Sequence, residues 1–220
     1  MPSPLSRENP SPRYRELTDM YREMHLHGEK FLGIPADRTF PGMSLPPQAA
    51  RIRRMIERTG AANILDYGSG KGLQYESSCR LADGTVVENV QDYWGVDFVQ
   101  CYDPSFPPFS QLPTGKFDGV ISTDVLEHCP EEDIPWIVEE MFSFADRFVF
   151  ANVACYQAKK RLPNGENAHC TIKPVEWWIE VMDAVAGRRS GLVWEVWIQH
   201  VVAEGGVQKL IERRIGSPEG

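Results

Sequence analysis

Apolar residues follow two different spacings along the chain. Short β-rich apolar runs alternate with longer segments in which apolar residues recur every three or four positions. The first pattern is typical of buried strands and the second of amphipathic helices. The runs that predict strands are 63–68, 97–104, 117–124, 147–154, 192–202 and 207–215. The segments that predict helices are 13–27, 47–59, 75–82, 130–145 and 174–187.

The alternation of strands and helices predicts an α/β fold. Apolar strands joined by helices pair in parallel, so helices are expected on both faces of one mostly parallel sheet. The last two runs have no helix between them and are joined by "AEGG" at 203–206, which predicts a β-hairpin. That hairpin would insert an antiparallel strand into the sheet.

The composition is that of an ordinary folded domain with an acidic surface. The chain has 220 residues, 42% of them hydrophobic, and a net charge of −8, so binding to nucleic acid through a basic face is disfavoured. No apolar run approaches the ~20 residues that span a bilayer, and the proline-rich start lacks the apolar core of a signal peptide. The five cysteines form no CxxC pair and no Cys/His pair at zinc-ligand spacing, which predicts buried free thiols in the cytoplasm and no metal site.

One short segment carries the strongest chemical signal. In "ILDYGSGKG", residues 64–72, an apolar strand ends in an acid and three glycines follow at alternate positions. A loop at the carboxyl end of a parallel strand, opening a helix, would present free N–H groups and a positive dipole end. A nucleoside-triphosphate loop requires Gly-Lys followed by Ser or Thr, but here Lys71 precedes Gly72. A dinucleotide fingerprint would need a glycine where Leu73 stands.

This segment resembles the first motif of the class I S-adenosylmethionine-dependent methyltransferases, an apolar strand ending in (D/E)-x-G-x-G-x-G. Their donor carries a sulfonium and an α-ammonium, and an acid at the strand end suits that cationic methionine end. The resemblance implies a Rossmann-like, doubly wound, mostly parallel seven-stranded sheet that ends in an antiparallel β-hairpin, with S-adenosyl-L-methionine as cofactor. The donor-binding residues that it implies in this loop are Asp66, Tyr67, Gly68, Ser69, Gly70 and Gly72.

A second segment resembles the same family. "FDGVISTDVLEH", residues 117–128, is similar to the fourth-strand segment of the methyltransferases that carry "DVLEH". That likeness implies donor contacts by Thr123, Asp124 and Val125. The proline-rich "DPSFPPFSQLP" before it leaves little room for the helix that normally separates strands two and three. "FSQLPTGKFD" resembles the segment that packs around adenine, and the candidates there are Ser110, Gln111 and Leu112.

In this family an acid at the end of the second strand holds the ribose hydroxyls. Asp97, in "WGVD", and Asp103, in "CYDP", are the two candidates. We prefer Asp103, because "DFVQCY" is the better buried strand and Asp103 stands at its carboxyl end. Both acids lie further from Gly70 than the roughly 20 residues usual in nucleotide folds, so we infer an insertion across residues 80–95.

The residues that would bind the methyl acceptor are sought mainly after the strand predicted at 147–154, which corresponds to the fifth strand of the family. Methyl transfer is an in-line displacement, and a base is needed only where the acceptor loses a proton, as a hydroxyl does. His128 and His169 are the candidate bases, although each could instead have a purely structural role in its turn or loop. The candidate acceptor contacts are Tyr156, Lys159, Lys160 and Trp177, with solvated surface or a helix edge as their alternative roles.

These features predict an S-adenosylmethionine-dependent methyltransferase acting on a small polar acceptor, by O-methylation of a sugar or other hydroxylated metabolite. The alternatives are N- or C-methylation of a similar acceptor, or a donor-binding partner subunit without an acceptor site. We divide the chain into a disordered or extended proline-rich arm at 1–12, an N-terminal helix and lid segment at 13–46, and a methyltransferase domain at 47–216. In related enzymes such N-terminal segments cap the donor site, so residues 40–45 are expected to form part of a lid.

Overall fold

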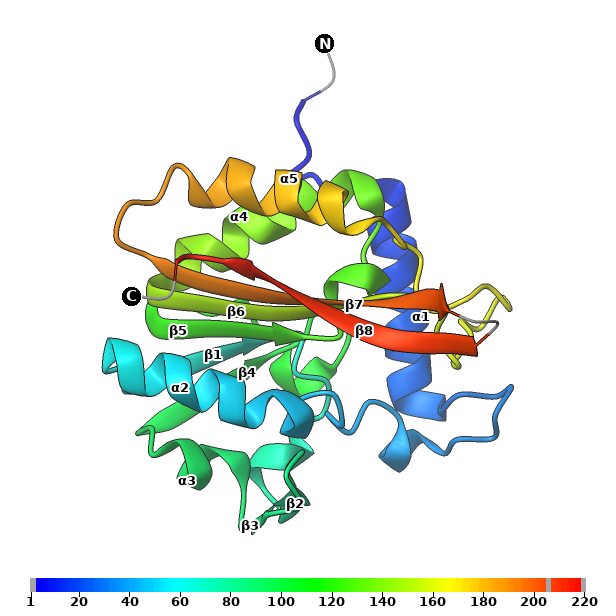
Figure 1. Ribbon diagram of the computed structural model, residues 1–220. Helices are drawn as coiled ribbons and strands as arrows, with labels where there is room; N and C mark the ends of the chain where they lie inside the picture. Colours follow the sequence, from blue (N-terminus) through cyan, green and yellow to red (C-terminus); the bar gives the residue numbers. More distant parts are fainter. Residues whose placement is uncertain (1–2, 205–206, 219–220) are drawn as a thin grey trace.

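The computed structural model describes residues 3–204 and 207–218. Its main sheet has six strands in the order β4-β1-β5-β6-β7-β8 (Figure 1). Neighbouring strands from β4 to β7 are parallel, and β8 is antiparallel to β7. The strands are β1 Asn63–Tyr67, β4 Phe98–Tyr102, β5 Phe117–Thr123, β6 Ala145–Cys155, β7 Val193–Glu204 and β8 Val207–Gly216.

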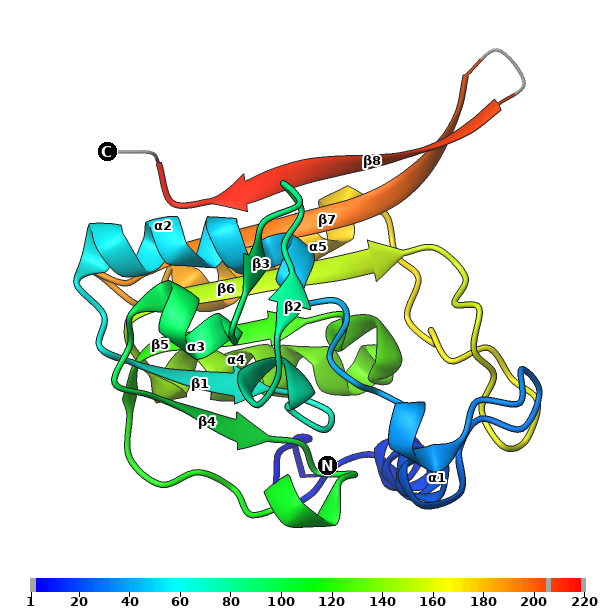
Figure 2. The ribbon, with the colours of Figure 1, turned by 90° about the horizontal axis from the view of Figure 1, so that it is seen from below.

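Helices cover both faces of this sheet, which confirms the predicted α/β fold. α2 (Ala49–Thr59) and α3 (Val90–Trp94) pack on one face, and α4 (Ile134–Phe144) and α5 (Val175–Ala186) on the other (Figures 1 and 2). Each helix turns its apolar residues inward, so the central strands are buried on both sides. Gly60, in the left-handed region at φ 66°, ends α2 as predicted.

The sheet has six strands, so the expectation of seven is wrong. Residues 103–116, all of them described, contain one 3-10 turn, Pro107–Phe109, and otherwise cross from β4 to β5 in irregular conformation. Prolines occupy positions 104, 107, 108 and 113 of this segment. Because proline has no N–H to donate, it disfavours both a helix interior and a central strand. The connection from β4 to β5 therefore adds neither a helix nor a strand.

The helix expected at 75–82 is also wrong. A 3-10 turn, Leu73–Tyr75, follows the glycine loop, and a two-stranded ribbon comes next, formed by β2 (Cys79–Arg80) and β3 (Val86–Val87). Asp83-Gly84 lies in the connecting turn, with Gly84 at φ 88°, and Asp-Gly is a strong hairpin signal. This ribbon and α3 occupy the insertion inferred at residues 80–95.

β7 and β8 form the predicted terminal hairpin. Their register pairs Val196 with Ile215 and Val201 with Leu210. β8 is the outer strand of the sheet, so the antiparallel strand is added at the edge and is not inserted between parallel strands. The loop end of the hairpin projects past the neighbouring strands in Figure 2, and the turn itself, at 205–206, lies outside the described residues.

The proline-rich arm is fixed to the domain. Arg7 forms an ion pair with Glu140 of α4. Ser11 caps α1 (Pro12–His27), and its hydroxyl accepts the N–H of Tyr14 at 3.0 Å. Of the two expectations for the arm, disordered or extended, disorder does not hold from Arg7 onward, because a partly buried ion pair and a helix cap hold this part of the arm in place.

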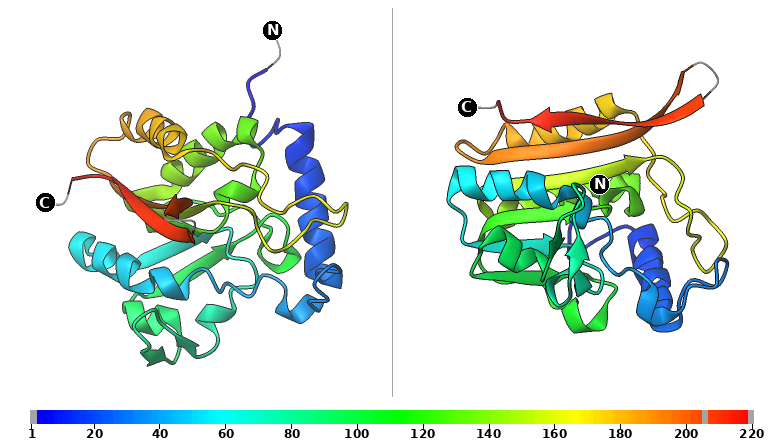
Figure 3. Two further views of the ribbon diagram at one scale, coloured as in Figure 1. Left: turned by 45° about the vertical axis from the view of Figure 1, so that its right-hand side comes forward. Right: turned by 60° about the horizontal axis from the view of Figure 1, so that its bottom comes forward.

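α1 stands at the carboxyl ends of the strands, away from both sheet faces (Figure 3). Leu17 and Met24 of α1 are buried against Leu162 and Ala168, which belong to the long loop between β6 and α5. The hydroxyl of Tyr21 also donates to the Ala168 carbonyl at 2.7 Å. α1 and this loop together form a wall beyond the strand ends.

Two expectations from composition can be compared with the fold. Among the described residues, no helix has the length and apolar character needed to cross a bilayer. All five cysteines are free thiols, as predicted, but none is fully buried, and Cys170 is exposed. Their burial was therefore overestimated.

Candidate functional site

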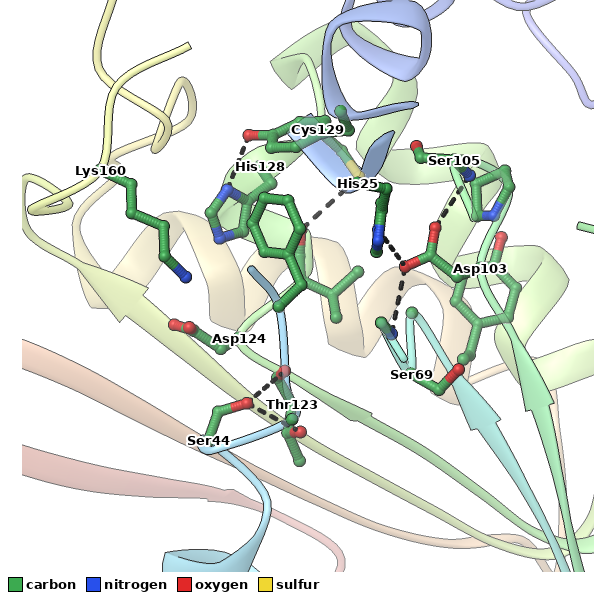
Figure 4. Close-up of a pocket in the computed structure, with 18 of the residues that line it drawn as sticks. His25, Ser44, Ser69, Asp103, Ser105, Thr123, Asp124, His128, Cys129 and Lys160 are labelled. Carbon is green, nitrogen blue, oxygen red and sulfur yellow. Dashed lines mark hydrogen bonds and ion pairs between the residues drawn. The ribbon is translucent and has the colours of Figure 1, made fainter. Parts of the chain in front are cut away.

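A cavity of about 460 Å³ lies at the carboxyl ends of β1, β4 and β5. The chain passes from β1 to β4 on one side and later to β5 on the other, so the strand order reverses here. Ligands of open α/β sheets bind at such a point, and the volume is in the range of small-molecule sites. α1 and residues 38–44 close the cavity from outside, residues 158–160 form a further wall, and Figure 4 shows side chains that face into it.

The glycine loop lines the cavity, and its N–H groups from residue 68 to residue 72 are all bonded within the protein. The expectation of free N–H groups at a helix start is therefore wrong, because the helix is replaced by a three-residue 3-10 turn. A loop without free N–H groups is a poor binding site for an anion. The bonds run from Gly68 and Ser69 to the Tyr102 carbonyl, from Gly70 to the Asp103 carboxylate, from Lys71 to the Phe40 carbonyl, and from Gly72 to the Ser69 carbonyl.

Two glycines of the loop are required by close packing. Gly68 and Gly70 have φ of 89° and 59°, a region that favours glycine. A Cβ on Gly68 would lie 2.5 Å from the Val125 side chain, and one on Gly70 would lie 2.6 Å from the Phe40 carbonyl oxygen. The loop is thus held between the turn after β5 and the lid segment.

Asp66 ends β1 beneath this loop and keeps one carboxylate oxygen unpaired. The Tyr75 hydroxyl donates to Oδ2 at 2.8 Å, and the Gln74 amide donates to the same oxygen at 3.3 Å. Oδ1 is buried and has no hydrogen-bond partner in the described part of the chain. Burial raises the pKa of Asp66 to about 7, against a lowering by the Tyr75 hydrogen bond and with a further rise from nearby Asp103.

Asp103 lies at the cavity, whereas Asp97 does not. Asp97 precedes β4 at its amino end, and Asp103 follows it at the carboxyl end. Oδ2 of Asp103 accepts the Gly70 N–H at 3.1 Å, and Oδ1 accepts the Ser105 N–H at 2.8 Å. His25 of α1 brings Nε2 to 3.8 Å from Oδ2 (Figure 4). The preferred second acid is therefore positioned beside the first, while its role toward a ribose stays a prediction.

The predicted lid segment lines the cavity from Phe40 to Ser44. The Phe40 carbonyl accepts the Lys71 N–H at 3.1 Å, and the Ser44 hydroxyl donates to the Thr123 carbonyl at 3.1 Å. Phe40 has φ 52°, and its ring centroid lies 5.7 Å from that of Tyr21. A left-handed backbone is rare for a bulky residue and persists only where its surroundings hold it. These contacts tie the segment to both the glycine loop and β5.

His128 and His169, 41 positions apart in the sequence, meet in the cavity with ring centroids 4.7 Å apart. Nδ1 of His128 lies 3.0 Å from the Ala168 carbonyl and 2.8 Å from the Tyr21 hydroxyl, and Nδ1 of His169 lies 2.6 Å from the Tyr156 carbonyl. Because a carbonyl only accepts, we assign the proton of each neutral ring to Nδ1, which leaves Nε2 with its lone pair. Burial lowers the pKa of His128 to about 4, and the neighbouring His169 adds to the lowering.

Asp124 and Lys160 complete this side of the cavity. Asp124 follows β5 with φ 61°, and its N–H donates to the Asn152 carbonyl at 3.2 Å. The Lys160 ammonium lies 4.6 Å from the centre of the Phe40 ring and points toward Asp124 (Figure 4). Burial lowers the pKa of Lys160, and Asp124 opposes that shift. The Asp124 carboxyl group and the Lys160 amino group therefore lie side by side at the cavity wall.

The structure brings most of the predicted site residues together. The residues that line the cavity are Asp66, Tyr67, Gly68, Ser69, Gly70, Asp103, Thr123, Asp124, Val125, His128, Lys159, Lys160 and His169. The predicted residues outside its lining are Gly72, Ser110, Gln111, Leu112, Tyr156 and Trp177.

Each of these departures has a local reason. Gln111 and Leu112 belong to the exposed crossing to β5, with Ser110 at its start, and Gly72 turns toward Cys101. Tyr156 directs its hydroxyl to Gln199 at 3.3 Å, and Trp177 packs against Trp178 and Lys173. The predicted adenine contacts and these two aromatic acceptor contacts therefore lie outside the lining of this cavity.

α1 supplies a wall of the cavity where an N-terminal cap was expected, but the helix residues that form it were not predicted. Its residues at the cavity are Tyr14, Leu17, Thr18, Tyr21 and His25. The apolar stripe of this helix is visible in the sequence, but a stripe does not reveal which surface it covers. The polar His25 directly beside the stripe was the available signal, since a buried histidine next to an apolar face needs a partner.

The fold and the cavity define an α/β protein with a cavity of small-molecule size at the switch point of a parallel sheet. No protein-family model, curated protein or solved structure matches the chain. Its function must therefore follow from the chemistry of the cavity.

Proposed function

We propose that this chain is an S-adenosylmethionine-dependent methyltransferase acting on a small hydroxylated acceptor. The observation that carries the proposal is the polarity beneath the glycine loop, where the N–H groups are bonded but a buried oxygen of Asp66 is not. A phosphate-binding loop has the opposite polarity, because it presents free N–H groups to an anion. This loop suits a cation that lies against the backbone.

The residues present fit the cationic donor. Asp66 and the buried hydroxyl of Ser69 both have oxygens without a partner in the described part of the chain, and they would face the methionine end. Asp103 follows the neighbouring parallel strand, where Cys101 pairs with Asp66. That position matches the ribose-binding acid of the class I family that the sequence resembles.

The acceptor side supports transfer to a hydroxyl. When bound, the donor supplies a methyl group whose carbon–sulfur bond breaks, with the electron pair left on sulfur, as the acceptor oxygen bonds to carbon. The chain itself aligns the acceptor and takes up its proton. The proton acceptor would be Nε2 of His128 or of His169, and burial lowers the pKa of His128 to about 4, which makes it a weaker base than an ordinary histidine. Asp124 and Lys160 would bind polar groups of the acceptor.

Phe40→Gly is expected to weaken donor binding about 2- to 10-fold, the equivalent of one aromatic contact. The substitution removes the ring that contacts Tyr21 and Lys160, while glycine tolerates φ 52° without strain. Calorimetric dissociation constants measure the effect. Met43→Gly, at a lid residue that is 70% exposed, is the matched control, and equal constants for the two variants would show that Phe40 does not hold the lid.

Calorimetry with S-adenosylmethionine, S-adenosylhomocysteine, ATP and NAD⁺ tests the proposed function. The first two should bind, and the two phosphate ligands should not. Incubation with methyl-labelled donor and an extract of polar metabolites should then yield a labelled product. Failure of both sulfur ligands to bind would reject the proposal, and binding without transfer to any extract would favour a donor-binding subunit.

A further inference from the structure

Three side chains of metal-ligand type meet at the acceptor end of the cavity. Asp124, His128 and His169 each place one ligand atom so that the three atoms lie within 4.8 Å of one another. They come from the end of β5, the turn after it and the loop before α5. We call them the acid–histidine cluster.

Both imidazoles are oriented as metal-binding histidines usually are. Their Nδ1 atoms are fixed by the carbonyls of Ala168 and Tyr156, which leaves Nε2 of each ring available. A second hydrogen bond of this kind is a general feature of metal-ligating histidines, because it sets the tautomer and raises ligand basicity. In Figure 4 the second ring nitrogen of His128 faces the space beside Asp124 and Lys160.

A buried acid adjoins the cluster in the chain. Glu127 is 0% exposed, its Oε1 accepts the Ala154 N–H at 2.6 Å, and its Oε2 has no partner in the described part of the chain. Glu127 directly precedes His128, and its backbone carbonyl accepts the N–H groups of the two residues after His169. These hydrogen bonds join the turn and the loop that carry the two imidazoles.

We propose that the acid–histidine cluster binds a divalent first-row transition-metal ion, such as Zn²⁺ or Mn²⁺, beside the methyl acceptor. Two imidazoles and one carboxylate favour such an ion over Mg²⁺ or Ca²⁺, which prefer oxygen ligands. Ligand atoms that share an ion through bonds of about 2.1 Å lie at most about 4.2 Å apart. Small side-chain rotations therefore suffice to close separations of up to 4.8 Å.

The ion would replace the proton-acceptor role of the histidines, because a nitrogen lone pair that binds the ion cannot also take up a proton. Both histidines would be ligands, and the coordination positions left open would accept an oxygen of the acceptor, whose hydroxyl pKa a bound cation lowers. This second step rests on the proposed methyltransferase function, whereas the metal site itself does not. The sequence predicted no metal site because two of these ligands lie 41 positions apart.

Co²⁺ binding to the full chain, after dialysis against a chelator, tests the site. One ion per chain should bind, with a visible absorption spectrum that Zn²⁺ abolishes by displacement. His169→Gln and Asp124→Asn should each weaken Co²⁺ binding by at least about 10- to 100-fold. That is the loss seen when a residue that only hydrogen-bonds to a metal ligand is replaced, and loss of a ligand itself should cost no less. Circular dichroism of both variants establishes that they fold.

Two variants in the same cavity serve as controls. His25→Gln removes a cavity histidine outside the cluster and should bind Co²⁺ as the unsubstituted chain does. Lys160→Gln removes the cation beside Asp124 and should bind Co²⁺ equally well or more tightly. The site is overturned if the unsubstituted chain binds no stoichiometric Co²⁺, or if His169→Gln binds it as well as His25→Gln does.

Calorimetry with S-adenosylmethionine on the same samples separates the two proposals. Donor binding without Co²⁺ binding overturns the metal site and leaves the methyltransferase proposal standing. Co²⁺ binding without donor binding supports the metal site and rejects the methyltransferase proposal.

Discussion

Asp66→Asn is expected to weaken binding of S-adenosylmethionine about 10- to 100-fold, the equivalent of one hydrogen bond to a charged group. The substitution keeps the size of the side chain and leaves an oxygen that accepts the Tyr75 hydroxyl, which lies 2.8 Å from Oδ2 in the native chain. It removes the negative charge whose second oxygen, Oδ1, is buried without a partner. The loss therefore reports the attraction between Asp66 and a cationic ligand.

The pH dependence of the same site has a defined sign. Asp66 has a pKa of about 7 in the folded chain against 3.8 for an ordinary aspartate. As the pH rises from about 4 to 7, the unfolded chain loses this proton while the folded chain keeps it, so stability falls by on the order of a few kcal/mol. Because a cationic donor favours the ionised carboxylate, its affinity should instead rise with pH up to about 7 and then level off.

Asp66→Asn should therefore be more stable than the unsubstituted chain at pH 8, although it binds the donor more weakly. Thermal unfolding without ligand and calorimetry at pH 6, 7 and 8 measure the two effects. Asp97→Asn, at the amino end of β4 and outside the cavity lining, is the control and should change neither quantity. A donor affinity that is the same for both asparagine variants would reject the role assigned to Asp66.

The position of the glycine loop at the cavity was predictable because its determinants are local in sequence. The strand, the acid and the glycines of "ILDYGSGKG" are consecutive, and Gly68 and Gly70 are fixed by backbone conformation and close approach. The absence of the helix expected at residues 75–82 could not be predicted from these eight residues of mixed character, because the structure of a short segment depends more on tertiary context than on propensity. Asp83-Gly84 forms the turn of a hairpin there. Without a helix after the glycine loop, no helix dipole favours an anion at the loop.

The acceptor half depends on contacts between distant segments. The sequence contains His128 and His169 but does not show that their loops meet, nor that Ala168 and Tyr156 supply the carbonyls that fix their rings. An N-terminal cap was expected, but the residues of α1 that line the cavity could not be predicted, because an amphipathic stripe indicates a helix and not the surface that it covers. Residues 110–112 show the converse case, in which a local resemblance predicted contacts to adenine, but the path of the chain places these residues outside the cavity lining.

Arg7→Met is expected to lower the free energy of unfolding by about 2 to 4 kcal/mol, somewhat less than removal of one partner from a fully buried ion pair costs, because the pair is partly buried. The Arg7 guanidinium pairs with Glu140, donates to the Tyr67 hydroxyl at 2.8 Å, and lies 5.0 Å from the centre of the Trp136 ring. Only 21% of the Arg7 side chain and 13% of the Glu140 side chain are exposed. Methionine fills much of the same volume but leaves the Glu140 carboxylate without its cation.

Chemical denaturation of the full chain measures this loss, and two further variants identify its cause. Arg13→Met breaks the α1 pairs with Glu16 and Glu166, whose side chains are 54% and 53% exposed, and should cost about 0 to 1 kcal/mol. Arg7→Met combined with Glu140→Met removes both charges and should recover part of the stability, because a buried pair replaced by apolar groups is often neutral. If Arg7→Met cost no more than Arg13→Met, the arm would not be a structural part of the domain. The Tyr67 hydroxyl donates to Glu140 at 2.6 Å, and Tyr67 follows Asp66 at the end of β1. The same result would therefore mean that the arm does not help to hold the end of β1 in place.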